Sequence, residues 1–155
     1  MPEQSQSTGG RILALDLGQR RIGLAISDEL GITAQGLDTL ERTRLRDDLD
    51  RLAGLACERG VTLFLVGNPL HMSGREGRQS EWVRQFADKL ISRTSCRVQL
   101  WDERLTSVQA GRVLRESGIS IQKRARAVDR LSAVLLLGSF LDSRRPLDLG
   151  RGPVE

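Results

Sequence analysis

The stretch RILALDLGQRRIGLAIS (11–27) decides the fold of this chain. It contains two β-type apolar runs, at 11–16 and 21–27, which are separated by a short turn that contains a glycine. Two such runs joined by a short turn predict an antiparallel hairpin. A third, weaker strand is predicted at 33–39. The chain is therefore expected to begin with three strands, and the first of them ends on an aspartate, Asp16.

The rest of the chain alternates strands and helices. VTLFLV (61–66) is a continuous apolar run, typical of a strand covered on both faces, and RVQLW (97–101) predicts another strand. Apolar residues at helical spacing predict helices at 43–58, 78–93 and 126–142. A further helix is predicted to begin at Thr106 and Gln109, which have capping-box spacing. The main order, βββαβαβα, predicts an α/β fold with a mixed five-stranded sheet and helices on both faces.

The length and the ends of the chain bound its organisation. A chain of 155 residues suits one domain, which we expect at 11–142 between polar tails at 1–10 and 143–155. The N-terminus has no apolar signal-peptide segment, and no apolar run reaches the roughly 18 residues of a membrane span. We therefore expect a cytoplasmic protein that contacts no membrane. Cys57 and Cys96 lie far apart in sequence, which predicts reduced, mostly buried thiols rather than a disulfide or zinc framework.

Three acidic residues are candidates for a site, and two of them fall at predicted strand ends, where ligand sites of α/β sheets lie. Asp16 ends the first strand, Glu103 stands two residues past RVQLW, and Asp129 lies among apolar residues near the start of the last helix. Each also has a structural explanation: turn chemistry for Asp16, surface exposure for Glu103, and a favourable helix N-terminus for Asp129. An ionised aspartate on an apolar helix is costly unless it is paired or binds a metal. We therefore predict a shared catalytic and metal site.

The chemistry of such a site follows from its charge. Three carboxylates within a few ångströms repel one another and would take up protons. One or two Mg²⁺ or Mn²⁺ ions would cancel the repulsion, because these metals prefer oxygen ligands. Two ions roughly 3.5–4 Å apart can activate a water and stabilise the leaving oxygen of a phosphodiester. The only histidine, His71, is then not needed for the core chemistry.

Basic residues stand beside all three acids. The chain carries a formal net charge of +4, and six of its basic residues are candidates for binding nucleic acid: Arg20, Arg21, Arg104, Lys123, Arg124 and Arg126. Such clusters predict a phosphate-binding track, although a solvated basic face is the alternative. With two Trp, three Phe and no Tyr, the chain offers little base stacking, which favours recognition of the backbone. The loop at 67–79 could cradle phosphate or be a mobile surface loop.

Four blocks of the sequence resemble one known family. They are LDLGQRRIGLAISD (15–28), VGNPLHMSGREG (66–77), LWDERLTSVQA (100–110) and KRARAVDRLSAVLLL (123–137). In order and spacing they resemble the YqgF (RuvX) family over almost all of residues 11–142. The resemblance implies a ribonuclease H-like fold, similarity to RuvC-type Holliday junction resolvases, and maturation of the 5′ end of pre-16S rRNA. The family's acidic residues correspond to Asp16, Glu103 and Asp129. Departures from the residues common in the family are Asn68, His71, Ser73 and Ser132.

Four functional hypotheses are compatible with these features. The leading one is a metal-dependent nuclease that acts on structured RNA, with precursor rRNA as the substrate and with a monomer or weak homodimer as the active form. The second is a DNA four-way junction resolvase, which would need a two-fold dimer to cut symmetrically. The third is a non-catalytic nucleic-acid-binding factor in transcription or ribosome assembly. The fourth takes D-L-G-x-x-x-x-G as the phosphate loop of an actin-like ATPase, which needs two such lobes.

Overall fold

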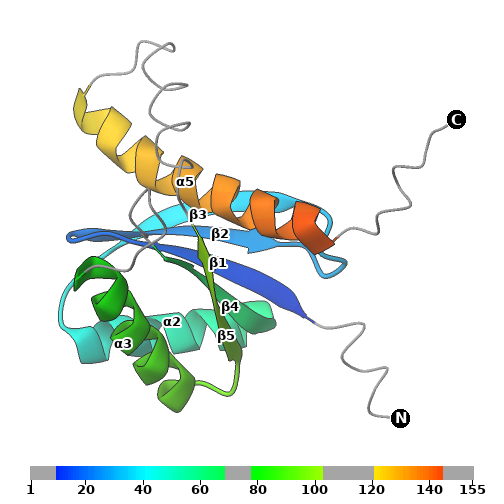
Figure 1. The fold of residues 1–155 in the computed structure, drawn as a ribbon, viewed down its shortest axis with the longest axis horizontal. Helices are drawn as coiled ribbons and strands as arrows, with labels where there is room; N and C mark the ends of the chain where they lie inside the picture. Colours follow the sequence, from blue (N-terminus) through cyan, green and yellow to red (C-terminus); the bar gives the residue numbers. More distant parts are fainter. Residues whose placement is uncertain (1–9, 69–77, 103–120, 145–155) are drawn as a thin grey trace, which may run out of the picture.

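The fold is a five-stranded mixed sheet between helices, as the sequence predicted. The computed structural model describes residues 10–68, 78–102 and 121–144, with the backbone alone for residues 78 and 121–129. Its elements are β1 (Arg11–Leu17), β2 (Arg21–Ser27), β3 (Ala34–Glu41), α2 (Leu45–Arg59), β4 (Val61–Asn68), α3 (Arg78–Arg93), β5 (Arg97–Asp102) and α5 (Ile121–Arg144). The strand order across the sheet is β3-β2-β1-β4-β5 (Figure 1). β1, β2 and β3 pair antiparallel, whereas β4 is parallel to both β1 and β5.

The helices predicted at 43–58, 78–93 and 126–142 are present, and their bounds differ most at α5. α3 spans the predicted residues, and α2 ends at Gly60, whose φ of 71° lies in the left-handed region and whose N–H donates to Ala56 O. α5 begins at Ile121 rather than at 126, and it continues to Arg144. It therefore takes in two residues that were expected in the C-terminal tail. The helix predicted to open at Thr106 lies outside the described residues, as do 1–9 and 145–155 of the predicted tails.

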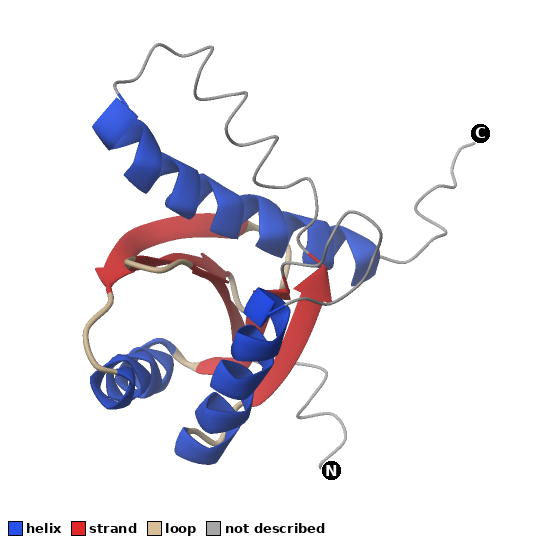
Figure 2. Ribbon diagram, turned by 60° about the vertical axis from the view of Figure 1, so that its left-hand side comes forward, coloured by secondary structure: helices blue, strands red, loops and turns tan. Residues whose placement is uncertain are grey.

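The helices form separate layers on the two faces of the sheet. α2 and α3 cover one face, and α5 crosses the other (Figure 2). Alternate residues of each strand point to opposite faces, so each strand contributes to both cores. The core under α2 and α3 contains, among others, Leu13, Leu15, Leu17, Phe64, Val66, Leu52, Val83, Phe86 and Leu90. The core under α5 contains Ile12, Ala14, Ala25, Leu63, Leu65, Ala133, Leu136, Leu137, Phe140 and Leu141.

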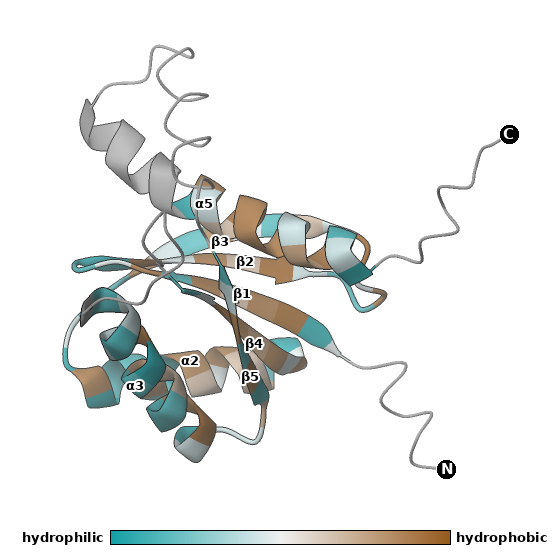
Figure 3. Ribbon diagram, viewed as in Figure 1, coloured by the Kyte–Doolittle hydropathy of each residue, from teal (hydrophilic) through white to brown (hydrophobic). Residues whose placement is uncertain are grey.

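Hydropathy follows this layering. The strands are hydrophobic through the middle of the sheet, and the described part of α5 alternates hydrophobic and hydrophilic residues around its axis (Figure 3). None of the helices in the described part of the chain is long and apolar enough to cross a membrane. Both cysteines are free thiols; Cys96 is half-buried, but Cys57 is exposed, so the expectation that both are mostly buried is wrong for Cys57. That residue lies on the outer side of the amphipathic helix α2.

Candidate active site

Asp16 lies near the carboxyl end of β1, on the face of the sheet that α5 covers. Its neighbours Leu15 and Leu17 belong to the core under α2 and α3, whereas Ala14 belongs to the core under α5. Strand alternation therefore places Asp16 on the α5 face. Leu15 and Leu17 are buried, but Asp16 remains partly exposed to solvent. Turn chemistry alone does not explain this residue, because it is paired within the central strand rather than being part of the turn.

Glycines flank Asp16 on both neighbouring strands. Asp16 stands opposite Gly23 of β2. On β4, the register of Leu15 with Val66 puts Gly67 at the level of Asp16. Because glycine has no side chain, neither neighbouring strand projects one beside the carboxylate on this face. A partly exposed carboxylate near the end of a central strand supplies the oxygen ligands that a divalent metal ion prefers.

A row of small residues brings α5 close to the sheet beside this carboxylate. Ala14 of β1 pairs with Ala25 of β2, which pairs with Gly36 of β3. A Cβ added to Gly36 would lie 2.8 Å from Cγ of Arg130 and 3.2 Å from Cγ2 of Val134, both on α5. The helix can approach this closely only because residue 36 is a glycine.

Position 129 lies on the stripe of α5 that faces the sheet. Residues 132, 133, 136, 137 and 140 of α5 are buried, and 129 precedes 132 and 133 by one helical turn. Because α5 begins at Ile121, Asp129 is in the third turn, where the helix N-terminus contributes little. The alternative explanation, that Asp129 is merely stabilised by a helix N-terminus, is therefore wrong. Its side chain is outside the described atoms; the nearby Ser132 hydroxyl is buried and has no hydrogen-bond partner among the described residues.

β5 is parallel to β4 and ends at Asp102, one residue before the predicted acid Glu103. The strand ends at Asp102, which pairs with Asn68 at the end of β4. Trp101 ties this end of β5 to α5: its Nε1 donates to Ser139 Oγ at 3.2 Å, and its ring meets Phe140 edge-on at 5.1 Å. Glu103 follows directly in sequence but lies outside the described residues, as does Arg104. Within the described part of the chain, no three potential ligands form a metal-binding group.

Five of the six predicted basic residues, all but Arg104, belong to elements at the same end of the sheet. Arg20 is exposed in the β1–β2 turn and Arg21, half-buried, begins β2. Lys123, Arg124 and Arg126 lie on the N-terminal half of α5, and their side chains are not among the described atoms. The β1–β2 turn and this half of α5 lie on the same side of the molecule, the left side in Figure 1. The backbone arrangement is compatible with a common basic surface next to Asp16.

One residue near the site has no signal in the sequence. Arg42, in the connection between β3 and α2, donates from Nη1 to the carbonyl oxygen of Gly18 at 2.8 Å. Gly18 itself closes the hairpin by donating to Arg21 O at 2.9 Å. An arginine in a connecting segment resembles any other surface arginine, so only the folded structure shows that it reaches the turn after Asp16.

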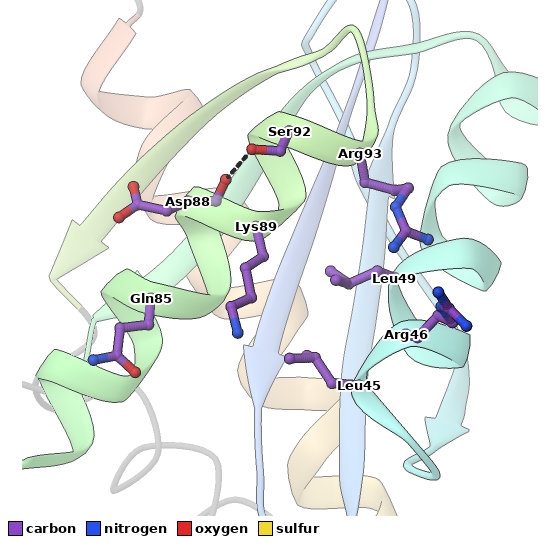
Figure 4. A pocket seen from close by; sticks show the side chains of 8 residues that line it. All are labelled: Leu45, Arg46, Leu49, Gln85, Asp88, Lys89, Ser92 and Arg93. Carbon is purple, nitrogen blue, oxygen red and sulfur yellow. Dashed lines mark hydrogen bonds between the residues drawn. The ribbon is translucent and has the colours of Figure 1, made fainter.

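A groove of about 490 Å³ lies between α2 and α3. Figure 4 shows Arg93 of α3 extending toward α2, Leu45 and Leu49 of α2 pointing toward α3, and Asp88 pointing away. Arg93 forms an ion pair with Asp50 of α2. The groove is on the face opposite Asp16, so it is not part of the candidate active site.

The family is shown by a sequence match that spans the fold. The family model for RuvX, described as Holliday junction resolvase, matches residues 10–143. The chain belongs to the RuvX family. Similar RuvX relatives include a protein of Koribacter versatilis, 52% identical over 142 residues (92% of this chain and 93% of the relative), and one of Myxococcus xanthus, 45% identical over 143 residues (92% and 95%). Both are named as candidate pre-16S rRNA nucleases.

Solved structures agree with the fold of this RuvX protein. RuvC of T. thermophilus in complex with a Holliday junction superposes with a TM-score of 0.52 at 13% identity, covering 86% of this chain and 95% of that one. Fowlpox virus resolvase in complex with Holliday junction DNA gives a TM-score of 0.54 at 13% identity, covering 86% and 97%. These similarities confirm the RuvC-like, ribonuclease H-like fold. The family description and the relatives' names are those of nucleases, and family membership places this chain among the hydrolases that act on phosphodiester bonds.

Proposed function

We propose that this RuvX-family protein is a divalent-metal-dependent nuclease that processes the 5′ end of precursor 16S rRNA in the cytoplasm, as a monomer or weak homodimer. The observation that carries the proposal is the placement of Asp16. It lies at the carboxyl end of a central strand, between glycines, on the face where α5 presents position 129. The names of the relatives, which share 40–52% of their residues with this chain, support precursor rRNA as the substrate.

Asp16, Glu103 and Asp129 would hold Mg²⁺ or Mn²⁺ as oxygen ligands. When bound, such ions supply an activated water and stabilise the negative charge on the leaving oxygen. The residues of the chain hold and orient the phosphodiester. Arg20, Arg21, Arg104, Lys123, Arg124 and Arg126 would bind phosphates on either side of the cleaved bond, mainly through charge, and so give salt-dependent affinity.

The test compares Mn²⁺-dependent cleavage of precursor 16S rRNA by the wild type, Asp16→Asn and Asp88→Asn. Asp88 is an exposed aspartate on α3, on the opposite face of the sheet, so its variant is a matched control for removing one carboxylate. We expect Asp16→Asn to lower kcat at least about 100-fold. Even substitutions of residues that only hydrogen-bond to a metal ligand lower metal affinity or activity about 10–100-fold. Asp88→Asn should cleave like the wild type. Wild-type-like cleavage by a folded Asp16→Asn protein would falsify the proposal.

A DNA four-way junction is the second candidate substrate. The family description and the two structural neighbours described above concern Holliday junctions. Symmetric cleavage of a junction requires two active sites related by a two-fold axis. The same assay run with a DNA junction, together with the mass of the protein in solution, separates the candidates: junction cleavage by a dimer, with precursor rRNA left intact, would favour the resolvase. Salt-dependent RNA binding that survives in all three acid variants, without cleavage, would instead indicate a non-catalytic factor.

A further inference from the structure

Arg42 holds the turn that follows Asp16 by two hydrogen bonds. Its Nη1 donates to the carbonyl oxygen of Gly18 at 2.8 Å, and its backbone N–H donates to the carbonyl oxygen of Arg20 at 2.8 Å. Gly18 is two residues beyond Asp16 in sequence. Arg42 comes from the connection between β3 and α2, so it joins the turn to a separate part of the fold.

The guanidinium of Arg42 is itself held in place from two sides. Its central carbon lies 4.6 Å from the centre of the Trp82 ring on α3, in cation–π geometry. Its Nε lies 3.7 Å from Oδ2 of Asp48, whose side chain is fully buried. Asp48 is fixed in turn through Oδ1, which accepts from Thr43 N at 3.0 Å and from Arg51 Nη2 at 2.7 Å. The side chain of Arg42 is only 18% exposed.

The buried pair of Arg42 and Asp48 contributes little to stability. Neither Arg42 Nε nor Asp48 Oδ2 has a hydrogen-bond partner among the described residues, although both are buried. A separation of 3.7 Å is too long for a hydrogen bond. Buried ion pairs with imperfect geometry recover little of their desolvation cost. The same arrangement does hold the guanidinium beside the turn, because its central carbon lies over the ring of Trp82 while Nη1 donates to Gly18 O.

We propose that Arg42 is a positioning residue for the active site: it fixes the β1–β2 turn, and through it the placement of Asp16 and of the phosphate-binding Arg20. The proposal rests on the proposed function, because it takes Asp16 to be a metal ligand. A displacement of about 1 Å at a reacting group can lower the rate about 100-fold, so a rigid turn beside Asp16 has catalytic value. Lysine cannot substitute fully, because its ammonium is a compact point charge and cannot contact Trp82 and Gly18 O in the way that a guanidinium does.

Arg51 provides the matched control. It also contacts Asp48, at 2.7 Å, but its remaining bonds are to Glu41 O and Thr43 Oγ1, and the contacts in this structure do not link it to the β1–β2 turn. Arg42→Ala and Arg51→Ala therefore each remove one arginine from the same buried carboxylate. Only the first also removes the side-chain hydrogen bond to Gly18 O in the turn.

The experiment measures thermal unfolding, Mn²⁺ affinity by calorimetric titration, and kcat and KM with precursor rRNA. Its arms are the wild type, Arg42→Ala, Arg42→Lys, Arg51→Ala and Asp16→Asn. We expect Arg42→Ala to weaken Mn²⁺ binding and to lower kcat about 10–100-fold, the range for residues that orient metal ligands, with KM changed much less. Arg42→Lys should recover part of kcat. Arg51→Ala should lose stability but keep wild-type Mn²⁺ affinity and kcat.

Equal Mn²⁺ affinity and equal kcat in folded Arg42→Ala and Arg51→Ala would overturn the positioning role. If Arg42→Ala does not fold, Arg42→Lys decides: wild-type Mn²⁺ affinity and kcat in that variant overturn the role, and a loss of both supports it. The Asp16→Asn arm separates this failure from that of the proposed function. If wild-type Mn²⁺ binding and cleavage do not depend on Asp16, the metal site is wrong, and the role assigned to Arg42 is overturned with it.

Discussion

The two faces of the sheet are built from side chains of different size. Toward α2 and α3 the strands present large residues such as Leu13, Leu15 and Phe64, which are fully buried. Toward α5 the middle of strands β1 to β3 presents the row of Ala14, Ala25 and Gly36. Large side chains fill a thick core and supply most of the buried apolar area. Small side chains let a helix approach closely, but they supply little area.

This difference suggests that one face mainly stabilises the fold and the other mainly positions α5. The face under α2 and α3 holds the sheet together, whereas the face under α5 sets where the helix lies relative to Asp16. Ile12 and Leu63 belong to the core under α5 toward the far end of the sheet, and Leu65 of β4 stands level with Ala14. The end near Asp16 is left with glycines at 23 and 67. We expect mutations on the two faces to separate stability from activity.

The largest effect is expected from matched truncations of buried leucines, one on each face. Leu90 of α3 and Leu137 of α5 are both fully buried. Leu90→Ala and Leu137→Ala should each lower the free energy of unfolding by about 2–5 kcal/mol, because each leaves a cavity. At a temperature where both remain folded, only Leu137→Ala should lower kcat, by up to about 100-fold, because α5 carries position 129 and can shift into the cavity.

Denaturant unfolding and cleavage of precursor rRNA measure the two quantities. The fraction folded at the assay temperature, taken from the unfolding curve, corrects each rate. An equal loss of corrected kcat in the two variants would contradict the proposal that only the face under α5 positions the active site.

A smaller effect is expected from enlarging a residue in the row under α5. Ala25→Val adds two methyl groups to a fully buried position, which should cost about 1–3 kcal/mol of stability through overpacking and push α5 away from the sheet. We expect weaker Mn²⁺ binding and slower cleavage. Ala87→Val, at a buried position on α3, is the control: calorimetry should show a stability loss without a change in Mn²⁺ affinity. A loss of affinity in both variants would contradict the prediction.

The smallest effect is expected at the end of the sheet away from Asp16. The N–H groups of Thr33 and Ile32 donate to Oδ1 of Asp28, which holds the pKa of Asp28 below its ordinary value of 3.8. Because the folded-state pKa is the lower one, ionised Asp28 stabilises the fold above the unfolded pKa. This contribution is lost as pH falls through the folded pKa.

Asp28→Asn should therefore unfold at a slightly lower temperature than the wild type at neutral pH. The difference should shrink at acidic pH, below 3.8. Melting curves over a pH series measure this, and kcat at neutral pH should equal that of the wild type. A clear drop in kcat would show that the two ends of the sheet are coupled.

Much of the fold could be predicted from local patterns. The hairpin around Asp16 and the bounds of α3 follow from apolar periodicity and turn residues, which act over a few residues. The start of α5 was misplaced because residues 121–125, IQKRA, favour a helix but show no apolar periodicity. That error mattered for the site, since it made Asp129 resemble a residue at a helix N-terminus.

The sequence by itself determined the order of strands and helices, the family, and the presence of an acidic residue at the end of the first strand. Only the tertiary structure decided that Asp16 stands opposite Gly23 on the face of α5, and that Arg42 reaches the carbonyl of Gly18, 24 residues away in sequence. Propensity and periodicity are local properties of a chain. Strand register and the contacts of a connecting segment depend on how distant residues pack together, and that is settled only when the whole sheet forms.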